Sequence, residues 1–457
     1  MALDIVILAA GLGKRMRSAL PKVLHPLGGR PLLAHVLDTA RALAPRKMIL
    51  VHGHGAEQVR HVFPEKDIEW VLQAEQLGTA HAVMQAMPRV GADADVLILY
   101  GDVPLVSAAT LERLLEAAGG GLAVLTADLE DPAAYGRVVR DASGRVKRIV
   151  ETRDASDAER ALREINAGFY ALSARRLAGW LKKIDNRNAQ KEFYLTDLVG
   201  LAVGEGTPVV AVKADHAWEA AGVNSKAELA ALERQYQRIC AEKLMEAGVT
   251  LADPARIDVR GALECGRDVA IDVNCVFEGR VSLGDAVRVG ANCVLRNVTV
   301  AAGSEILPFC HLEDSSIGER CRIGPFSRLR PGAQLAEEVH IGNFVEVKAS
   351  RLGAGSKANH LTYLGDSEVG ERVNVGAGTI TCNYDGVKKH ETVIEDGAFI
   401  GSDTQLIAPV TVGKGAYVAA GSSITTDVPS GALGIARGRQ ANVEGWVERK
   451  KTAPAKT

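Results

Sequence analysis

The hydrophobic pattern of the 457-residue chain changes its period once, near residue 250. Before that point, short β-branched or apolar runs alternate with stretches whose apolar residues recur at helical spacing. The runs predict strands over residues 4–9, 47–52, 96–100, 122–127 and 208–213, and helices over residues 31–43, 79–87 and 111–117. This alternation predicts an α/β fold with a mostly parallel sheet.

A second pattern governs the rest of the chain. Apolar residues at helical spacing over residues 225–247 predict one long helix between two domains. Beyond it, an apolar residue recurs every sixth position, which is typical of a parallel β-helix whose triangular coils are filled by these side chains. The seventeen predicted inward residues are Ile271, Phe277, Leu283, Val289, Leu295, Ile317, Ile323, Leu329, Leu335, Ile341, Val347, Ile394, Ile400, Leu406, Val412, Val418 and Ile424. We therefore expect domains at 1–224 and 249–457, with a linker helix at 225–248 and a C-terminal tail.

Composition narrows the class of protein. Hydrophobic residues make up 47% and charged residues 24%, which fits a globular protein too long for a single core. The net charge of −2 gives no electrostatic footprint for nucleic acid, and the basic run at 448–457 is interpreted as a solvated end. The apolar run at the N-terminus is too short for a signal peptide or a membrane anchor, so a cytoplasmic location is expected.

Cysteine usage points to packing rather than chemistry. The chain has seven Cys, an odd number without a CxxC pair, which argues against a disulfide framework and a zinc site. Cys275, Cys293 and Cys321 take small inward positions of the six-residue repeat. We therefore assign them a core role.

A glycine-rich turn follows the first predicted strand in LAAGLGKRM. Its spacing fits neither a Rossmann nor a P-loop motif, which leaves Gly11 and Gly13 flanked by Lys14, Arg15 and, after a short loop, Lys22. Backbone N–H groups and three cations beside them suit a polyphosphate. A solvated basic loop is the alternative interpretation.

A carboxylate is expected at the same edge of the sheet. The strand in VLILYGD ends at Asp102, and the carboxyl ends of parallel strands meet at one edge. A hard cation such as Mg²⁺ prefers oxygen ligands and bridges phosphates. An Asp after a strand is also a common turn residue or helix cap, so both interpretations stay open here.

The six-residue register indicates an anion site in the second domain. Arg330 and Lys348 take a position that usually holds Gly, Asp, Glu or Ala, and they are eighteen residues, or one coil, apart. They should stack roughly 4.8 Å apart, where two cations repel unless an anion joins them. A pair of solvated side chains is the alternative.

The coils after Lys348 carry further polar candidates. His360 in NHLTYL can take a proton near neutral pH, although a solitary loop His is often structural. The repeat breaks between Thr379 and Ile394 in a polar excursion that could complete a site. Ser402 and Ala420 are one coil apart and make a column of small residues, which tight coils also favour.

Nine motifs, by their order and spacing, resemble the bacterial bifunctional N-acetylglucosamine-1-phosphate uridyltransferase / glucosamine-1-phosphate N-acetyltransferase family. They are LAAGLGKRM, LPKVLH, QAEQLGTAHA, LYGDVPL, YGRVVR, VETRDA, EINAGFY, EFYLTDL and EAAGVNS. The likeness covers nearly the whole chain. It implies a Rossmann-like nucleotidyltransferase domain, a linker helix and a left-handed parallel β-helix. It also implies synthesis of UDP-N-acetylglucosamine for peptidoglycan and lipopolysaccharide, and a homotrimer formed through the β-helix.

The resemblance also implies roles for residues of the first domain. Arg15 and Lys22 would neutralise charge during transfer from UTP, and Asp102 with Asn224 would bind Mg²⁺. The uracil and phosphate side would be held by Leu8, Ala9, Ala10, Gly11, Gln73, Gly78 and Thr79. The sugar pocket would be lined by Tyr100, Gly101, Gly136, Glu151 and Asn166. One departure is Ala80, where the family usually has Gly, and Ala fits if its backbone φ is negative.

For the second domain, the resemblance implies direct acetyl transfer from acetyl-CoA to glucosamine 1-phosphate. His360 would be the general base that frees the 2-amino group. Glucosamine 1-phosphate would be held by Arg330, Lys348, Tyr363 and Asn374. Substrate or acetyl-CoA would be contacted by Ala377, Asn383, Tyr384, Ser402, Ala420 and Arg437. No acyl-enzyme is expected, because no Cys has an activating partner.

Two other functions stay open at the level of sequence. One is a pyrophosphorylase whose β-helix serves only assembly, which would give no reason for the Arg330 and Lys348 stack. The other is a scaffold or exchange-factor subunit that keeps both folds without the sites. That function predicts gaps at Lys22, Asp102 or His360, and all three residues are present.

Overall fold

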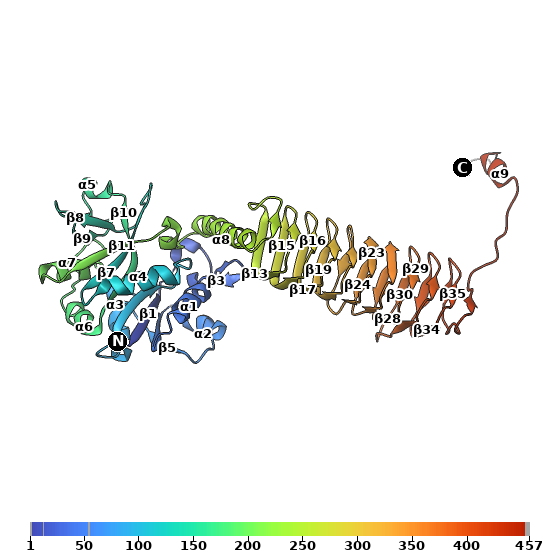
Figure 1. The fold of residues 1–457 in the computed structure, drawn as a ribbon, viewed down its shortest axis with the longest axis horizontal. Helices are drawn as coiled ribbons and strands as arrows, with labels where there is room; N and C mark the ends of the chain where they lie inside the picture. The colour runs from blue at the N-terminus through green and yellow to red at the C-terminus, as the bar shows by residue number, and fades with distance from the viewer. Residues whose placement is uncertain (1, 12, 54, 453–457) are drawn as a thin grey trace, which may run out of the picture. The chain divides into compact units, whose positions relative to one another are not determined.

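The structure is a computed structural model that describes residues 2–11, 13–53 and 55–452 (Figure 1). The chain divides into two compact units, Met1–Ile239 and Cys240–Thr457. The boundary falls inside a long helix, α8 (Lys226–Glu246), where the sequence predicts a helix over residues 225–247. Each unit contains its own buried apolar cluster.

The first unit is built on a nine-stranded sheet. Its main path runs β11-β7-β10-β6-β1-β4-β5, and β8 and β9 extend from β10. β1 pairs in parallel with β4 and β6, and only β10 and the β8–β9 pair introduce antiparallel neighbours among the described strands of this sheet. The predicted mostly parallel sheet is confirmed. The strands are β1 (Leu3–Ala9), β4 (Lys47–His52), β5 (Ile68–Leu72), β6 (Asp95–Tyr100), β7 (Leu122–Asp128), β8 (Arg137–Arg140), β9 (Val146–Val150), β10 (Glu164–Ser173) and β11 (Val209–Lys213).

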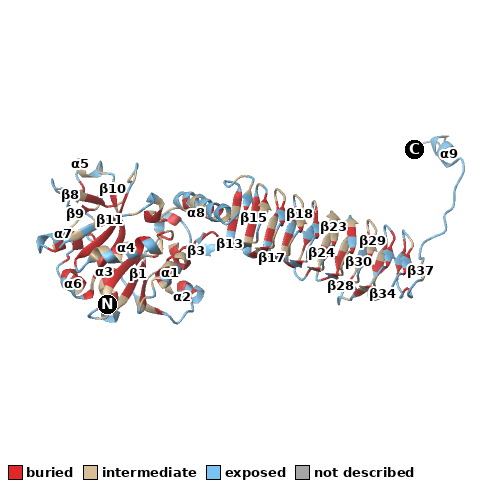
Figure 2. Ribbon diagram, in the orientation of Figure 1, coloured by how far each residue is buried: buried red, intermediate tan, exposed pale blue. Residues whose placement is uncertain are grey.

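Helices cover both faces of this sheet because successive strand residues point to opposite sides. In β1, Ile5 and Ile7 pack in one cluster with α1, α2 and α4, whereas Val6 and Leu8 pack in another with α3, α6 and α7. The helices are α1 (Leu32–Ala42), α2 (Ala56–Val62), α3 (Thr79–Ala86), α4 (Ala108–Ala118), α5 (Asp157–Arg160), α6 (Ala174–Leu181) and α7 (Asp197–Gly204). Figure 2 shows the buried strands between these partly exposed helices.

The predicted elements of this unit are all present, with ends shifted by up to three residues. The largest shift is in α4, which begins at Ala108 because Ser107 Oγ caps it by accepting the Thr110 N–H. The hydrophobic pattern does not predict the short strands β2 (Pro26–Leu27) and β3 (Arg30–Pro31), nor β5, β8, β9, β10, α2, α5, α6 and α7. β10 is the most consequential omission, since it lies in the middle of the sheet between β6 and β7.

The second unit is a parallel β-helix. Each coil pairs with the next at a spacing of 17 or 18 residues, as in Ile271 with Val289 and Val289 with Ile306. All seventeen predicted inward residues are buried, none more than 4% exposed. The buried Cys275, Cys293 and Cys321, together with Cys310, fill the same core.

Short strands form the walls of this β-helix. They are β12 (Thr250–Leu251), β13 (Ile257–Cys265), β14 (Ala270–Ile271), β15 (Cys275–Leu283), β16 (Arg288–Val289), β17 (Val294–Val300), β18 (Glu305–Ile306), β19 (His311–Ile317), β20 (Arg322–Ile323), β21 (Arg328–Leu329), β22 (Gln334–Leu335), β23 (His340–Asn343), β24 (Glu346–Lys348), β25 (Arg351–Leu352), β26 (Lys357–His360), β27 (Tyr363–Gly365), β28 (Ser367–Val369), β29 (Asn374–Val375), β30 (Ile380–Cys382), β31 (Thr392–Ile394), β32 (Phe399–Ile400), β33 (Gln405–Ile407), β34 (Val410–Val412), β35 (Tyr417–Val418), β36 (Ser423–Ile424) and β37 (Leu433–Gly434).

One excursion leaves the coils. β30 still pairs with β33, and the chain departs after Cys382 and returns at Thr392, so Val369 pairs with Ile394 across 25 residues. The excursion is therefore shorter than predicted, because Thr381 remains buried inside the coil. After the last coil, the described part of the chain includes the short helix α9 (Trp446–Thr452).

Candidate functional site

A cavity of about 580 Å³ opens at the carboxyl ends of β1 and β6. Adjacent parallel strands end here, which is where open α/β sheets bind ligands. The residues around it come from both strands, from the glycine turn and from α3. They are Leu8, Ala9, Ala10, Gly11, Gly13, Lys14, Arg15, Lys22, Val23, Gln73, Gln76, Gly78, Thr79, Ala82, Tyr100, Asp102, Glu192 and Asn224. The structure thus gathers most of the predicted residues of the first domain in one place.

The glycine turn presents its cations to this cavity. Gly13 has a φ of 57°, and a Cβ there would lie 3.0 Å from the Lys22 Cβ, so this position requires Gly. Lys14 and Arg15 are at the surface of the following one-turn helix, whereas Met16 is buried in one apolar cluster with Leu232 of α8. Because the Met16 side chain is buried, the short helix is held in one orientation, and Lys14 and Arg15 point away from the core.

Lys22 joins the two residues predicted to bind metal. Its Nζ forms an ion pair with Asp102 Oδ2 and donates a hydrogen bond of 3.2 Å to Asn224 Oδ1. The Lys22 and Asp102 side chains are largely buried. A carboxylate and an amide oxygen therefore converge on one cation, and this donor set is the kind that Mg²⁺ prefers.

The segment before α3 is fixed by backbone geometry. Gly78 has a φ of 118°, and a Cβ there would lie 2.5 Å from the Phe193 carbonyl oxygen. Gln73 Nε2 donates to the Gly78 carbonyl at 3.2 Å, and Thr79 Oγ1 accepts the Leu195 N–H at 3.1 Å. Ala80 is buried in α3 with negative φ, so Ala fits where the family usually has Gly.

Of the residues predicted for the sugar side, Tyr100 lines this cavity, whereas Gly101, Gly136, Glu151 and Asn166 are not among its lining residues. Glu151 Oε1 accepts from Thr196 Oγ1 at 3.1 Å, and a Cβ on Gly136 would lie 3.6 Å from the same Glu151 oxygen. Asn166 Nδ2 donates to the Tyr170 hydroxyl at 2.8 Å. Burial raises the pKa of Glu151, and the nearby carboxylates of Asp154, Asp197 and Glu192 raise it further.

Tyr100 lies between the cavity and these residues. Its ring packs against Gly168, where a Cβ would approach within 2.8 Å of the ring, and burial raises the pKa of its hydroxyl. Gly101 follows it, and its N–H donates to the Leu8 carbonyl at 2.9 Å. This hydrogen bond joins the ends of β1 and β6 at the edge of the sheet where the nucleotide is predicted to bind.

The second unit places Arg330 and Lys348 on adjacent coils, as the spacing predicts, because their preceding residues pair in register. Glu346 Oε1 accepts from Arg330 Nη1 at 2.9 Å. Lys389 of the excursion approaches Lys348 and lowers the pKa of its ammonium. Four outward residues of the preceding coils alternate in charge down to Arg330, namely Arg260, Glu278, Arg296 and Glu313. The alternation ends where Arg330 stacks on Lys348.

His360 has a partner, Asn343, that no sequence motif reveals. Its Nδ1 lies 2.9 Å from Asn343 Oδ1, and the two residues pair on adjacent coils. Because an amide oxygen only accepts, this contact places the proton on Nδ1 and leaves the Nε2 lone pair free. The side chain is exposed. This is the tautomer that a general base at Nε2 requires.

Three of the predicted residues after His360, namely Ala377, Ser402 and Ala420, continue one column along an edge of the β-helix. The backbone N–H following each member donates to the carbonyl of the member one coil before, as Gly378 to His360 and Asp403 to Ala377. The column runs Asn343, His360, Ala377, Ser402 and Ala420. Arg437 Nη1 closes its end by donating to the Ala420 carbonyl at 2.7 Å.

The strand β27 joins this column to the two stacked cations. Tyr363 begins β27, three residues after His360, and Gly365 ends it in register with Lys348. Asn383 Nδ2 contacts Asp366 and lies 3.4 Å from the Tyr363 hydroxyl. A three-residue strand spans about 7 Å, so both groups can reach one small ligand.

Two further predicted residues lie on neighbouring segments. Tyr384 is exposed in the excursion, and its hydroxyl donates to the Gly386 carbonyl at 2.7 Å. Asn374 begins β29 and pairs with Lys357 and Phe399 on the neighbouring wall.

Relatives of known name match the chain along nearly all of its length. A protein of Ralstonia nicotianae named Bifunctional protein GlmU is 57% identical over 99% of this chain and 100% of its own. Proteins of the same name from Herminiimonas arsenicoxydans and Bordetella parapertussis are 58% and 59% identical, each over 97% of this chain and 98% of its own. The chain belongs to the GlmU family.

Family domains agree with this assignment. Residues 5–186 match the MobA-like NTP transferase domain, residues 259–357 match the GMPPB C-terminal domain, and residues 391–426 match the bacterial transferase hexapeptide repeats. Like its relatives in the GlmU family, the chain is a bifunctional enzyme, with a nucleotidyltransferase unit and a hexapeptide acyltransferase unit.

Several contacts of these two sites could not be found from motifs. Asn343, Asp366 and Lys389 lie one coil from the predicted residues or in the excursion, and Gln76 and Glu192 reach the cavity from loops.

Among the described residues, no group of three or more His, Cys, Asp or Glu side chains could hold a metal ion. No helix in the described ranges has the length and apolarity to cross a membrane.

Proposed function

We propose that the first unit transfers UMP from UTP to N-acetylglucosamine 1-phosphate, giving UDP-N-acetylglucosamine and pyrophosphate. This proposal rests on Asp102 and Asn224, whose side-chain oxygens both contact the Lys22 ammonium. Oxygen atoms that surround one cation in this way also suit Mg²⁺. Asp102 and Asn224 would hold Mg²⁺, which would supply positive charge to neutralise the phosphates.

Different residues in and around the cavity contact different parts of the two substrates. The turn with Gly11 and Gly13 offers backbone N–H groups to the phosphates, and Arg15 and Lys22 add positive charge. The base lies toward Gln73, Gly78 and Thr79, and the sugar toward Tyr100, Glu151 and Asn166. A phosphate oxygen of the sugar phosphate forms a bond to the α-phosphorus of UTP while the bond to pyrophosphate breaks. Positioning and charge neutralisation supply the catalysis, without a protein nucleophile.

The second unit, in this proposal, acetylates glucosamine 1-phosphate. Arg330 and Lys348 bind its phosphate, with Tyr363 between them and His360. Asn343 holds His360 with Nε2 free to accept a proton from the 2-amino group as the nitrogen attacks the thioester carbonyl. The C–S bond of acetyl-CoA then breaks, and the thiol leaves. Ala377, Ser402, Ala420 and Arg437 line the edge along which the coenzyme extends.

The two reactions act in sequence, since the acetylated product of the second unit is the acceptor for the first. We further propose functional domains at residues 1–224 and 249–457 with a linker helix at 225–248, assembly as a homotrimer through the β-helix, and action in the cytoplasm on precursors of peptidoglycan and lipopolysaccharide. The proposed domains and assembly are supported by the long, parallel-stacked β-helix. They are also supported by the relatives that match the chain over its full length.

One assay tests both activities. The full chain is incubated with glucosamine 1-phosphate, acetyl-CoA, UTP and Mg²⁺, and each component is omitted in turn. UDP-N-acetylglucosamine should form only in the complete mixture, while N-acetylglucosamine 1-phosphate should accumulate without UTP. Formation of a nucleotide sugar from unacetylated substrate at an equal rate would contradict the proposed order.

A further inference from the structure

The side chain of Gln73 is held at the wall of the first unit's cavity by contacts of its amide nitrogen. Nε2 donates to the Gly78 carbonyl at 3.2 Å and lies 3.1 Å from His81 Nδ1. The backbone is fixed as well, because the Gln73 N–H donates to the His52 carbonyl and the Gln73 carbonyl accepts from Gln76 Nε2. Gln73 is only 3% exposed. Neighbouring groups, rather than solvent, therefore set the direction of its amide.

The Gly78 carbonyl decides which end of this amide faces it. A carbonyl oxygen only accepts, so Nε2 of Gln73, rather than Oε1, must lie opposite it. The second hydrogen of Nε2 is then available to His81 Nδ1, which must carry a lone pair. Both amide hydrogens are thus engaged. Oε1 is the group that Gln73 can offer to a ligand in the cavity that it lines, and Oε1 is an acceptor only.

The same contacts fix the tautomer of His81. With a lone pair on Nδ1, the neutral imidazole carries its proton on Nε2. Nε2 lies 3.1 Å from the amide nitrogen of Gln85, one turn later in α3, and a half-turn of that terminal amide brings its oxygen into position to accept. The ring also lies beside Phe193, with centroids 6.3 Å apart. His81 is half-buried and is not among the residues that line the cavity, so it acts on a ligand through Gln73.

A fixed acceptor at this place distinguishes the two common pyrimidine bases of RNA. Uracil carries a hydrogen on N3, which the Gln73 oxygen can accept. Cytosine has a lone pair on N3, which would face the same oxygen and repel it. A site whose polar group has a fixed direction discriminates strongly, because a wrong ligand leaves that buried group unpaired.

We propose that His81 is a positioning residue for selection of the base. It holds the Gln73 amide so that an acceptor faces the base, which selects a pyrimidine with a hydrogen on N3. This inference rests on the proposed function, in which the base lies toward Gln73, Gly78 and Thr79. Without the lone pair of His81, the amide of Gln73 keeps one hydrogen bond to Gly78, and its second hydrogen loses its acceptor. That hydrogen can then turn toward the base, where it suits N3 of cytosine.

The test compares His81→Leu with His81→Asn in the full chain. Leu has a similar size and no acceptor, whereas Asn places an amide oxygen near the position of Nδ1. Nucleotidyl transfer to N-acetylglucosamine 1-phosphate is measured with UTP and with CTP. For the Leu variant, the ratio of kcat/KM for UTP to that for CTP should fall by about tenfold or more, because one unpaired polar group changes discrimination by at least that factor. For the Asn variant, the ratio should stay within about threefold of the unaltered value, because the acceptor is restored.

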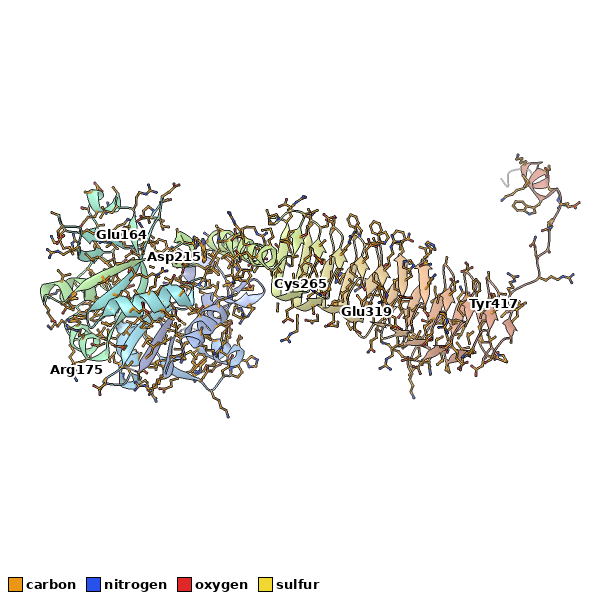
Figure 3. All side chains as sticks on the ribbon, in the orientation of Figure 1. Glu164, Arg175, Asp215, Cys265, Glu319 and Tyr417 are labelled. Carbon is orange, nitrogen blue, oxygen red and sulfur yellow. The ribbon has the colours of Figure 1, made fainter. Side chains whose placement is uncertain are left out.

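A matched control places Leu at an exposed position of the same unit. The Arg175 side chain is 86% exposed, and Figure 3 labels it at the outside of this unit. Arg175→Leu should change neither the rate with UTP nor the ratio. Circular dichroism and urea unfolding of all variants show whether the first unit is folded. If His81→Leu unfolds it, His81→Ala takes its place with the same expectation.

The outcomes separate this inference from the proposed function. Absence of nucleotidyl transfer by the unaltered chain with either nucleotide overturns the proposed function and this inference with it. An unaltered chain that uses UTP and CTP equally, or a His81→Leu variant that keeps the preference for UTP, overturns only the inference. An equal loss of rate with both nucleotides in that variant also overturns it, since His81 would then support the site without selecting the base.

Discussion

The Lys22 ammonium pairs with the Asp102 carboxylate at the carboxyl end of β6, and the same nitrogen lies 3.2 Å from Asn224 Oδ1. A largely buried carboxylate is costly without a counter-charge, and Lys22 supplies one. The two predicted metal ligands are thus held together by a residue that is also predicted to bind phosphate.

Replacing Asp102 by Ala should abolish nucleotidyl transfer while leaving acetyl transfer intact. Loss of one electrostatic group at a reacting centre costs about 10²–10³-fold in rate, and loss of a metal ligand should cost at least as much. Pyrophosphate release and acetyl transfer are measured on the same preparation. Retained nucleotidyl transfer in this variant would remove Asp102 from the proposed role.

Lys22→Met should strengthen the binding of Mn²⁺ to the nucleotide-free protein, because the ammonium no longer competes for Asp102 and Asn224. The same substitution should weaken binding of UTP, since one phosphate cation is lost. Both affinities are measured by titration calorimetry. Lys14→Met removes a charge that lines the same cavity without contacting Asp102, and it should weaken UTP without strengthening Mn²⁺. Equal Mn²⁺ affinities in the two variants would contradict the competition.

His360→Ala should lose most acetyl transfer, on the order of 10²–10⁴-fold, and spare nucleotidyl transfer. Asn343 offers a finer test. Asn343→Asp adds a carboxylate beside the imidazole and favours its protonated form, so the rate should begin to fall at a higher pH as the solution is acidified. Asn343→Leu should lower kcat without that displacement. An unchanged pH profile in the Asp variant would argue against His360 as the base.

Glu151→Gln should make the first unit more stable at pH 7. Burial raises the pKa of Glu151 in the folded protein, so its ionised form costs stability at pH values above that pKa. The advantage of Gln should shrink as the pH falls and vanish below about pH 4, where Glu is protonated in the unfolded chain as well. Urea unfolding at both pH values measures the difference. A larger advantage at low pH would have the wrong sign.

Leu232→Ala should destabilise the first unit by about 2–4 kcal/mol, as large-to-small changes in a core do. Leu232 of α8 is buried with Met16, Leu27, Leu32 and Val223, beneath the cations of the glycine turn. We also expect a higher KM for UTP, since Met16 loses its support. Lys243→Ala, at an exposed position near the end of α8, serves as the control. An unaltered urea midpoint would show that α8 does not support this turn.

The sequence predicted the β-helix more completely than the first unit. A residue such as Ile323 or Val347 must be apolar whatever its neighbours are, because each coil repeats the same environment, so the period reveals the fold. β10 escaped prediction because a buried central strand in EINAGFYALS has neither alternation nor turn signals of its own. Its pairing is a long-range property.

Sequence by itself determined the change of period near residue 250, the inward residues of the coils, the stacking of Arg330 on Lys348 and the candidates Asp102 and His360, since local spacing fixes all of these. Tertiary structure alone decided that Lys22 pairs with Asp102, that Asn343 orients His360, and that Gly78 and His81 hold the Gln73 amide. These relations depend on side chains brought together from separate elements, and on the sign of φ at turns such as Gly78. Hydrophobic spacing along a chain does not encode either property.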